Sequence, residues 1–316
     1  MRSVLPLFFL TIAVRCMAQT PPPIRYESLP GVAVYNNGYL FSWNSPEYTE
    51  VTFYGRDAKR IYSVPEDKGG IYHVAWAIDS DGVAAGAYQA RDAWVGRIDI
   101  FDPNGKLTRT IKTGSYVPQH VAFAPDHTIW AAGYQAENDG REDFNVLHHY
   151  ARTGEELGQL LQWSQIAGDE NSYTAVQPLL GGKRLYTGKD RIGLQVNSDF
   201  GHDTWIEVSY SGALLRKYNL GTPGELCYGL AGMAADGTVY AAISVGDTFR
   251  GWAVLDHSNR AWYKIAGSSA GQIIGSNGEN LVFSHKDGAW TVLQFVPHST
   301  LRLEKPQQAD ALIARR

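Results

Sequence analysis

The sequence is poor in cysteine, with only two among 316 residues. Cys16 lies in an apolar N-terminal segment, which leaves Cys227 alone in the rest of the chain. A single cysteine excludes an internal disulfide. We expect Cys227 to be a small core side chain, since an unpaired cysteine in an apolar context usually has that role.

Basic character and long apolar runs are also lacking. The 28 Lys and Arg residues are outnumbered by 32 Asp and Glu residues, giving a net charge of −4. Without a basic stripe, nucleic acid is not expected as a partner. Beyond the N-terminal segment no stretch is apolar enough to cross a bilayer, so we predict no membrane span.

The first 18 residues have the pattern of a signal peptide. Arg2 precedes the apolar run Val4–Val14, and Cys16-Met17-Ala18 places small residues where signal peptidase cleaves. We therefore expect export to the periplasm or the exterior, with a mature chain beginning near Gln19. Removing residues 1–18 takes away two arginines and no acid, so the net charge becomes −6.

The strongest signal in the remaining chain is internal repetition. His-Val-Ala-Trp-Ala at 73–77 returns as His-Val-Ala-Phe-Ala at 120–124, and each copy is followed by Ala-Ala-Gly and then Tyr-Gln-Ala. A third copy begins at Leu230-Ala231-Gly232. Repeats of roughly 40–50 residues are typical of propellers.

Each repeat carries a tight turn between two short apolar, β-rich runs. Asn-Gly and Asp-Gly favour two-residue hairpins in which both central residues take a positive φ. Four of the six tight turns are of this kind, and the six together predict an all-β, six-bladed β-propeller with four antiparallel strands per blade. The turns are Asn37-Gly38, Asp81-Gly82, Asp126-His127, Gly181-Gly182, Asp236-Gly237 and Asn277-Gly278.

This pattern divides the chain into a signal peptide (1–18), an extended lead-in (19–31), the propeller (32–303) and a polar C-terminal tail (304–316). The sequence leaves open how the ring closes. Residues 32–64 and 272–303 each have enough length for four strands. Residues 24–28 would then pair at an edge, although many propellers combine both chain ends in one blade.

The cadence of apolar strand, Asp-Gly turn, apolar strand and loop, followed by Ile-Phe-Asp-Pro-Asn-Gly-Lys-Leu at 100–107, resembles NHL-type and gluconolactonase-like six-bladed propellers. The gluconolactonase-like branch would imply a metal-binding glutamate in a Glu-Gly-Pro-Trp opening. The comparable stretch here is Glu27-Ser28-Leu29-Pro30, so that motif is missing. A shared fold does not fix function.

The repeat also predicts which end of the channel binds ligands. In a four-stranded blade the first and third connections share one face, and the middle connection and the inter-blade link share the other. The predicted middle connections are long and charged, which is typical of binding loops. They are residues 91–94, 136–144, 189–204 and 246–250.

The candidate ligand-binding residues therefore lie in these loops or begin the innermost strands at the same face. Tyrosines there would suit a carbohydrate or peptide ligand. The candidates are His73, His120, Tyr173, Tyr228, Asn171, Glu225, Gln272, Arg91 and Arg141.

His73 and His120 occupy equivalent or nearly equivalent places in neighbouring repeats, so we expect their imidazoles to face the same way. With Glu225 they could bind a divalent metal such as calcium or zinc. Alternatively, the two histidines form hydrogen bonds at the channel mouth without a metal.

No complete catalytic motif occurs in the sequence. We therefore predict an exported binding or interaction module whose partner at the long-loop face is a small molecule, a carbohydrate, or a peptide or protein. The alternative is a lactonase-like hydrolase or lyase that uses a metal or a histidine base at the channel mouth.

Overall fold

The computed structural model describes most of the chain. The described residues are 21–27, 29, 32–36, 38–43, 50–55, 57–65, 71–90, 96–136, 143–167, 185–197, 203–221, 226–246 and 248–304. The predicted signal peptide and most of the C-terminal tail lie outside them. Within the described part no helix is long and apolar enough to cross a membrane.

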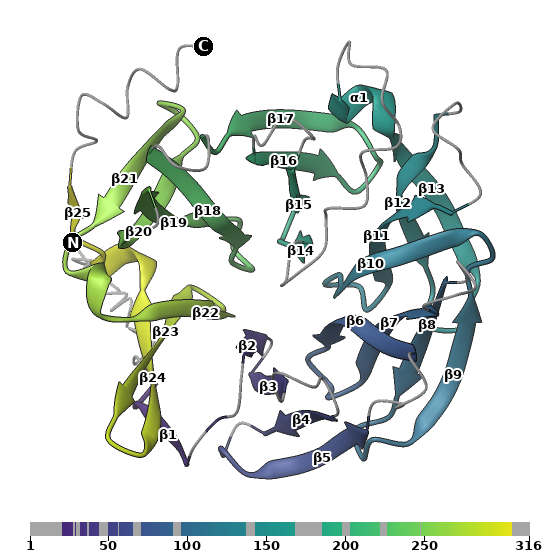
Figure 1. The fold of residues 1–316 in the computed structure, drawn as a ribbon, viewed down its shortest axis with the longest axis horizontal. Coiled ribbons are helices and arrows are strands. Elements are labelled where there is room, and N and C mark those ends of the chain that lie inside the picture. Colours follow the sequence, from purple (N-terminus) through teal and green to yellow (C-terminus); the bar gives the residue numbers. More distant parts are fainter. Residues whose placement is uncertain are drawn as a thin grey trace, which may run out of the picture.

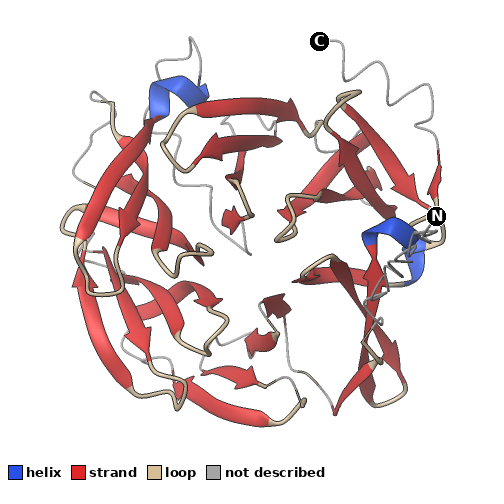
Figure 2. Cartoon of the chain, turned by 180° about the vertical axis from the view of Figure 1, so that it is seen from behind, coloured by secondary structure: helices blue, strands red, loops and turns tan. Residues whose placement is uncertain are grey.

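Strands dominate the described residues (Figure 2). The first half contains β1 (Ile24–Glu27), β2 (Val32–Asn36), β3 (Tyr39–Trp43), β4 (Glu50–Tyr54), β5 (Arg60–Pro65), β6 (Ile71–Ile78), β7 (Ala84–Ala90), β8 (Gly96–Phe101), β9 (Leu107–Lys112), β10 (Tyr116–Phe123), β11 (Ile129–Gln135), β12 (Asn145–Tyr150) and β13 (Glu156–Gln162).

The second half contains β14 (Leu185–Thr187), β15 (Arg191–Asn197), β16 (Asp203–Ser209), β17 (Leu214–Asn219), β18 (Leu226–Met233), β19 (Val239–Val245), β20 (Thr248–Asp256), β21 (Ala261–Ile265), β22 (Gln272–Asn277), β23 (Asn280–Asp287), β24 (Trp290–Pro297) and β25 (Leu303–Glu304). The described helices are short: α1 (Trp163–Ala167), η2 (Ser268–Ala270) and η3 (His298–Thr300).

The strands form three four-stranded sheets, one of five strands and one of eight. The eight-stranded sheet has two antiparallel halves, which meet where Tyr35 of β2 pairs in parallel with Gly275 of β22. Divided there, the described strands give five groups of four and one of five, in which β25 is added at the edge. We call these groups blades one to six in chain order. Figure 1 shows them around a ring, with β2, β6, β10, β14, β18 and β22 nearest the centre. The predicted β-propeller is confirmed.

The hydrophobic core lies between the blades. Each of the six buried clusters in the described part combines side chains of two neighbouring blades. Strand alternation produces this arrangement, because successive side chains point to opposite faces. In β8, Ile98 and Ile100 join the cluster shared with blade three, whereas Phe101 joins the one shared with blade one.

Both chain ends contribute edge strands. β1 pairs with β24 in antiparallel register, so blade six consists of β22, β23, β24 and the N-terminal β1. The C-terminal β25 instead pairs with β21 of blade five. The prediction that residues 272–303 contain all four strands of their blade is wrong. They supply three strands of blade six, and residues 24–27 of the predicted lead-in supply the fourth, so both chain ends combine in one blade.

Gly275 allows the close approach at this seam. Its φ is 153°, and a Cβ atom there would lie 1.9 Å from the carbonyl oxygen of Tyr35. Any larger residue would force β2 and β22 apart. Blades one and six can therefore meet through their backbones only because this position is glycine.

The tight turns differ in detail from the two-residue form predicted. The Gly82 N–H donates to the Asp79 carbonyl (3.0 Å), and the Asp79 N–H donates to the Val83 carbonyl (2.8 Å). Of the pair Asp81-Gly82, only Gly82 has a positive φ, 87°. The turn is therefore a three-residue hairpin whose last residue is left-handed.

The first hairpin of blade four is also placed differently from the prediction. β14 and β15 are joined at Lys189-Asp190, where the Gly188 N–H donates to the Arg191 carbonyl (2.8 Å). The predicted turn at Gly181-Gly182 lies outside the described residues. The predicted long loop 189–204 is wrong, because residues 191–197 form β15.

Candidate functional site

A cavity of about 370 Å³ lies where the innermost strands end at the tight-turn face. All six blades contribute to it, so the cavity occupies this end of the central channel. Its lining residues are Tyr35, Asn36, Asp79, Ser80, Phe123, Ala124, Pro125, Tyr186, Thr187, Gly188, Met233, Ala235, Tyr240, Gly275, Ser276, Asn277 and Gly278.

Polar and apolar lining residues are segregated around the ring. Blades six, one and two, which are neighbours, supply Ser276 and Asn277, Asn36, and Asp79 and Ser80. We call these five residues the polar arc. Blades three, four and five supply mainly apolar side chains, and we call Phe123, Pro125, Tyr186, Met233 and Tyr240 the apolar arc. The cavity is thus amphipathic.

Hydroxyl groups within the apolar arc are already paired. Thr187, which lies beside it, donates from Oγ1 to the Phe123 carbonyl (2.5 Å). Burial raises the pKa of Tyr240 well above its usual value. The neighbouring Tyr186 raises this pKa further, through its charge and through a hydrogen bond between the two side chains. These hydroxyls hold neighbouring blades together, so they leave that side of the cavity largely apolar.

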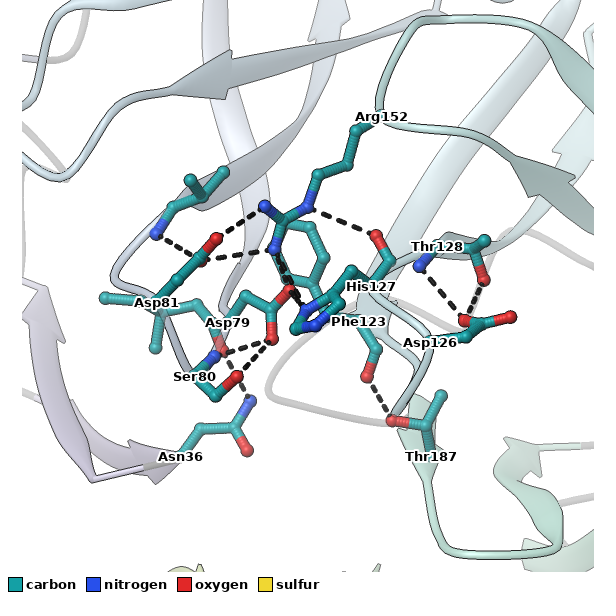
Figure 3. Close-up of polar contacts among 12 residues, drawn as sticks. Asn36, Asp79, Ser80, Asp81, Phe123, Asp126, His127, Thr128, Arg152 and Thr187 are labelled. Atoms are coloured by element: carbon teal, nitrogen blue, oxygen red, sulfur yellow. Dashed lines mark hydrogen bonds and ion pairs between the residues drawn. The ribbon is translucent and has the colours of Figure 1, made fainter.

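Among the described residues Asp79 is the one carboxylate that lines the cavity, and its side chain is 4% exposed. Oδ2 accepts hydrogen bonds from Arg152 and from His127 Nδ1 (2.8 Å) of blade three. Oδ1 accepts the Ser80 N–H (2.5 Å). Figure 3 shows these contacts beside Asn36 and Thr187. Both carboxylate oxygens are therefore occupied by protein donors.

The local sequence explains how His127 and Arg152 reach Asp79. His127 stands where Gly82 stands in blade two, and it adopts the left-handed φ of 68°. Histidine tolerates this region better than most residues. Asp126 stabilises the turn by accepting the Thr128 N–H (3.1 Å). The cluster therefore joins the first hairpin of blade two to both hairpins of blade three.

Arg152 also binds Asp81, at the rim of the same hairpin. Nη1 lies 2.6 Å from Oδ2, and Nη2 lies 3.1 Å from Oδ1. The hydrogen bonds from Arg152 hold the pKa of Asp81 below its usual value. Such bidentate pairs fix the guanidinium plane. Arg152 is thus held against blade two by two carboxylates.

The structure places His73 inside a blade. The ring is buried, packs on Trp76 with 4.4 Å between centroids, and lies 3.2 Å from Asp99 through Nε2. Burial opposes ionisation of Asp99, but hydrogen bonds from His73 and Thr110 outweigh it and lower the pKa of Asp99. His73 thus binds a carboxylate of its own blade.

The two predicted histidines do not face the same way. A bulge between His73 and Ala75 changes the alternation of β6, and His73 lies on the face toward blade one. In β10 the pairing runs without interruption from His120 to Phe123, so His120 shares a face with Ala122, toward blade four. They cannot bind one metal ion together.

The other predicted residues are not gathered into one site. Tyr228 is buried and stacks on Trp262 (5.0 Å between centroids), whereas Gln272 is exposed at the start of β22. The remaining candidates lie outside the described residues, and their role stays a prediction; they are Arg91, Arg141, Asn171, Tyr173 and Glu225.

The described residues contain no group of three or more His, Cys, Asp or Glu side chains able to hold a metal. Cys227 is half-buried, with Sγ 2.9 Å from Ser244 Oγ. It is therefore less buried than the core position predicted from the sequence.

Comparison with family models finds no match, and comparison with curated proteins finds none. Among solved structures, a protein from Lactobacillus plantarum is 10% identical with a TM-score of 0.47, covering 89% of this chain and 84% of that chain. A luciferin-regenerating enzyme is 10% identical with a TM-score of 0.46, covering 89% and 97%. BBS1N in complex with ARL6DN is 14% identical with a TM-score of 0.44, covering 85% and 78%. Such distant likeness says nothing about activity or ligand, so the fold assignment rests on the strand pairing.

Proposed function

We propose that this chain is a non-enzymatic binding module that takes a small molecule into the cavity at the tight-turn end of its channel. The observation that carries the proposal is the convergence of all six innermost strands on that one cavity. Its volume of about 370 Å³ is within the range of small-ligand sites.

The chemistry of the lining favours binding over catalysis. In the described part of the chain no histidine or cysteine lines the cavity, and the Ser80 Oγ donates to Asp79 Oδ1 (3.3 Å) within its own turn. A nucleophile needs an adjacent base that is free to take its proton. The oxygens of Asp79 are held by Arg152, His127 and Ser80, so Asp79 is poorly placed to act as that base.

The proposal differs from the sequence prediction in the end of the channel that it uses. The sequence predicted a site at the long-loop face that includes Arg91 and Arg141, which both lie outside the described residues. A ligand there would bind independently of the cavity, so substitutions in the cavity separate the two sites.

Ser276→Leu tests the proposal, because a leucine at this lining position fills part of the cavity. We expect a ligand found by thermal-shift screening of neutral and charged metabolites to stabilise the wild type by about 2.7 kcal/mol at 100 times its Kd. The Ser276→Leu protein should lose most of that stabilisation.

Ser299→Leu is the matched control, because Ser299 is exposed in η3 and is not among the residues that line the cavity. It should respond to the ligand as the wild type does. Equal stabilisation of the Ser276→Leu protein and the wild type would place the site elsewhere and overturn the proposal.

We further propose that this binding takes place outside the cytoplasm. The support is the charged start, apolar run and Cys-Met-Ala sequence of residues 1–18. N-terminal sequencing of protein recovered from the periplasm or medium should begin near Gln19. Full-length protein that retains Met1 and stays in the cytoplasm would contradict export.

A further inference from the structure

The arrangement of polar and apolar groups restricts the shape of a ligand for this cavity. The polar arc carries the amide and hydroxyl groups of Asn36, Ser80, Ser276 and Asn277. Asn36 Nδ2 already donates to the Ile78 carbonyl (3.3 Å) and Ser80 Oγ to Asp79, but the Asn36 Oδ1 and the Ser80 Oγ can still accept hydrogen bonds. The apolar arc faces it from the opposite three blades with aromatic and thioether side chains. A complementary ligand needs one edge rich in hydrogen-bonding groups and one apolar face.

The contacts of Asp79 restrict the charge of the ligand. Its carboxylate is compensated by Arg152, and both oxygens already accept hydrogen bonds from the protein. The described lining contains no lysine, arginine or histidine side chain. A cationic ligand would find no free carboxylate oxygen, and an anionic ligand no basic group. Burying an unpaired charge is costly.

Resting on the function proposed above, we propose that the cavity selects a neutral cyclic polyol of monosaccharide size, and that Arg152 sets this selectivity by compensating Asp79. The hydroxyl edge of the sugar meets the polar arc, and its C–H face lies on the apolar arc. Arg152 does not line the cavity. It is therefore a positioning residue that acts through Asp79.

The test measures binding of three probes of similar size by calorimetry: glucose (neutral), glucosamine with its amine charged, and glucuronate (anionic). The wild type should bind glucose about tenfold more tightly than either charged analogue, which corresponds to about 1.4 kcal/mol. Arg152→Gln leaves Asp79 uncompensated and should raise the affinity for glucosamine relative to glucose by about tenfold.

Asp79→Asn should shift the preference the other way, because it removes one negative charge beside the cavity while Arg152 stays paired with Asp81. Glucuronate should gain relative to glucose by about tenfold. The double variant Asp79→Asn with Arg152→Gln should return to the neutral preference. If Arg152 had a purely structural role, its substitution would weaken the binding of all three probes together. The preference among the probes would then not reverse between the two variants.

Arg60→Gln is the control, because Arg60 forms an exposed pair with Glu50 (2.9 Å) far from the cavity. It should leave the order of the three probes unchanged, and circular dichroism should show that every variant is folded. If the Arg152→Gln and Asp79→Asn proteins both shifted the preference among the probes in the same direction, the role given to Arg152 would be wrong.

The outcomes also separate this inference from the function on which it rests. If none of the three sugars binds the wild type, but another metabolite stabilises it in a manner sensitive to Ser276→Leu, the ligand class is wrong and the binding function stands. If no metabolite depends on Ser276, the binding function fails as well.

Discussion

Tyr26→Ala is expected to lower the free energy of unfolding by about 3–5 kcal/mol, as truncation of a buried aromatic ring usually does. Tyr26 is 2% exposed and lies in the cluster shared by blades six and one. Its ring meets that of Tyr54 edge-on, with 5.6 Å between centroids. Urea denaturation measures the loss.

The large effect follows from the position of Tyr26 in β1, the strand that completes blade six. Losing the ring loosens the contact between this strand and blade one, at the seam between the two ends of the propeller. We therefore expect the variant to be destabilised whether or not a ligand is bound. β24, which pairs with β1, should also lose its hydrogen-exchange protection earlier than in the wild type.

Tyr26→Phe separates the ring from the hydroxyl. The buried hydroxyl has no hydrogen-bond partner among the described residues. Removing it should leave stability unchanged or slightly higher, since an unsatisfied buried polar group is costly.

Arg25→Ala is the control within the same strand. Arg25 pairs with Asp287 at 3.2 Å, and both side chains are largely exposed. Its removal should change stability by less than about 0.5 kcal/mol. Equal losses for Arg25→Ala and Tyr26→Ala would contradict the anchoring role of the ring.

The sequence was sufficient to predict the propeller because turn residues and strand patterns recur. Asp81-Gly82 and Asp236-Gly237 mark first hairpins, and both lie at turns in the structure. The alternation in β8 likewise places Ile98 and Ile100 on one face. These features depend only on residues that are close together in the chain, so they can be recognised in a single sequence.

Ring closure could not be decided in the same way, because it pairs residues far apart in the chain. Ile24 pairs with Leu293, and either of two edge arrangements satisfies the local pattern. The first turn of blade four was misplaced for a related reason. Gly181-Gly182 is a stronger turn signal than Lys189-Asp190, although the latter joins β14 to β15.

The candidate site was missed because its residues lack a chemical motif. Asn36, Ser80 and Asn277 read as ordinary turn residues, and only the ring brings them together. His73 and His120 attracted attention as possible ligands, but the bulge in β6 turns His73 toward Asp99. A usable signal was present in the turns themselves, since the innermost strands of all six blades end at one end of the channel.

A second buried carboxylate links two blades elsewhere in the ring. Glu207 of β16 is fully buried, and its Oε1 accepts a hydrogen bond from His257 Nε2 of blade five (2.6 Å). Its Oε2 accepts one from Arg191 Nη1 (2.9 Å). Burial alone would raise the pKa of Glu207, but these two partners outweigh it and hold the pKa below the ordinary 4.5.

Glu207→Ala is therefore expected to lower the free energy of unfolding by about 3–5 kcal/mol, as removing one partner of a buried ion pair does. The loss arises because Arg191 and His257 remain partly buried without their shared acceptor. Glu304→Ala is the control, since Glu304 pairs with Lys264 at 3.8 Å on the exposed edge of blade five. Its effect should be small.

The pH dependence identifies the charge as the cause. A carboxylate whose folded pKa is lowered stabilises the fold fully above its unfolded pKa of about 4.5, and this stabilisation is lost as pH falls through the folded value. Glu207→Gln keeps the shape but cannot titrate, so its stability should change less than that of the wild type as pH falls below 4.5. Urea denaturation repeated across that range measures both proteins under identical conditions. Parallel curves for the two would mean that Glu207 holds blades four and five together through shape alone.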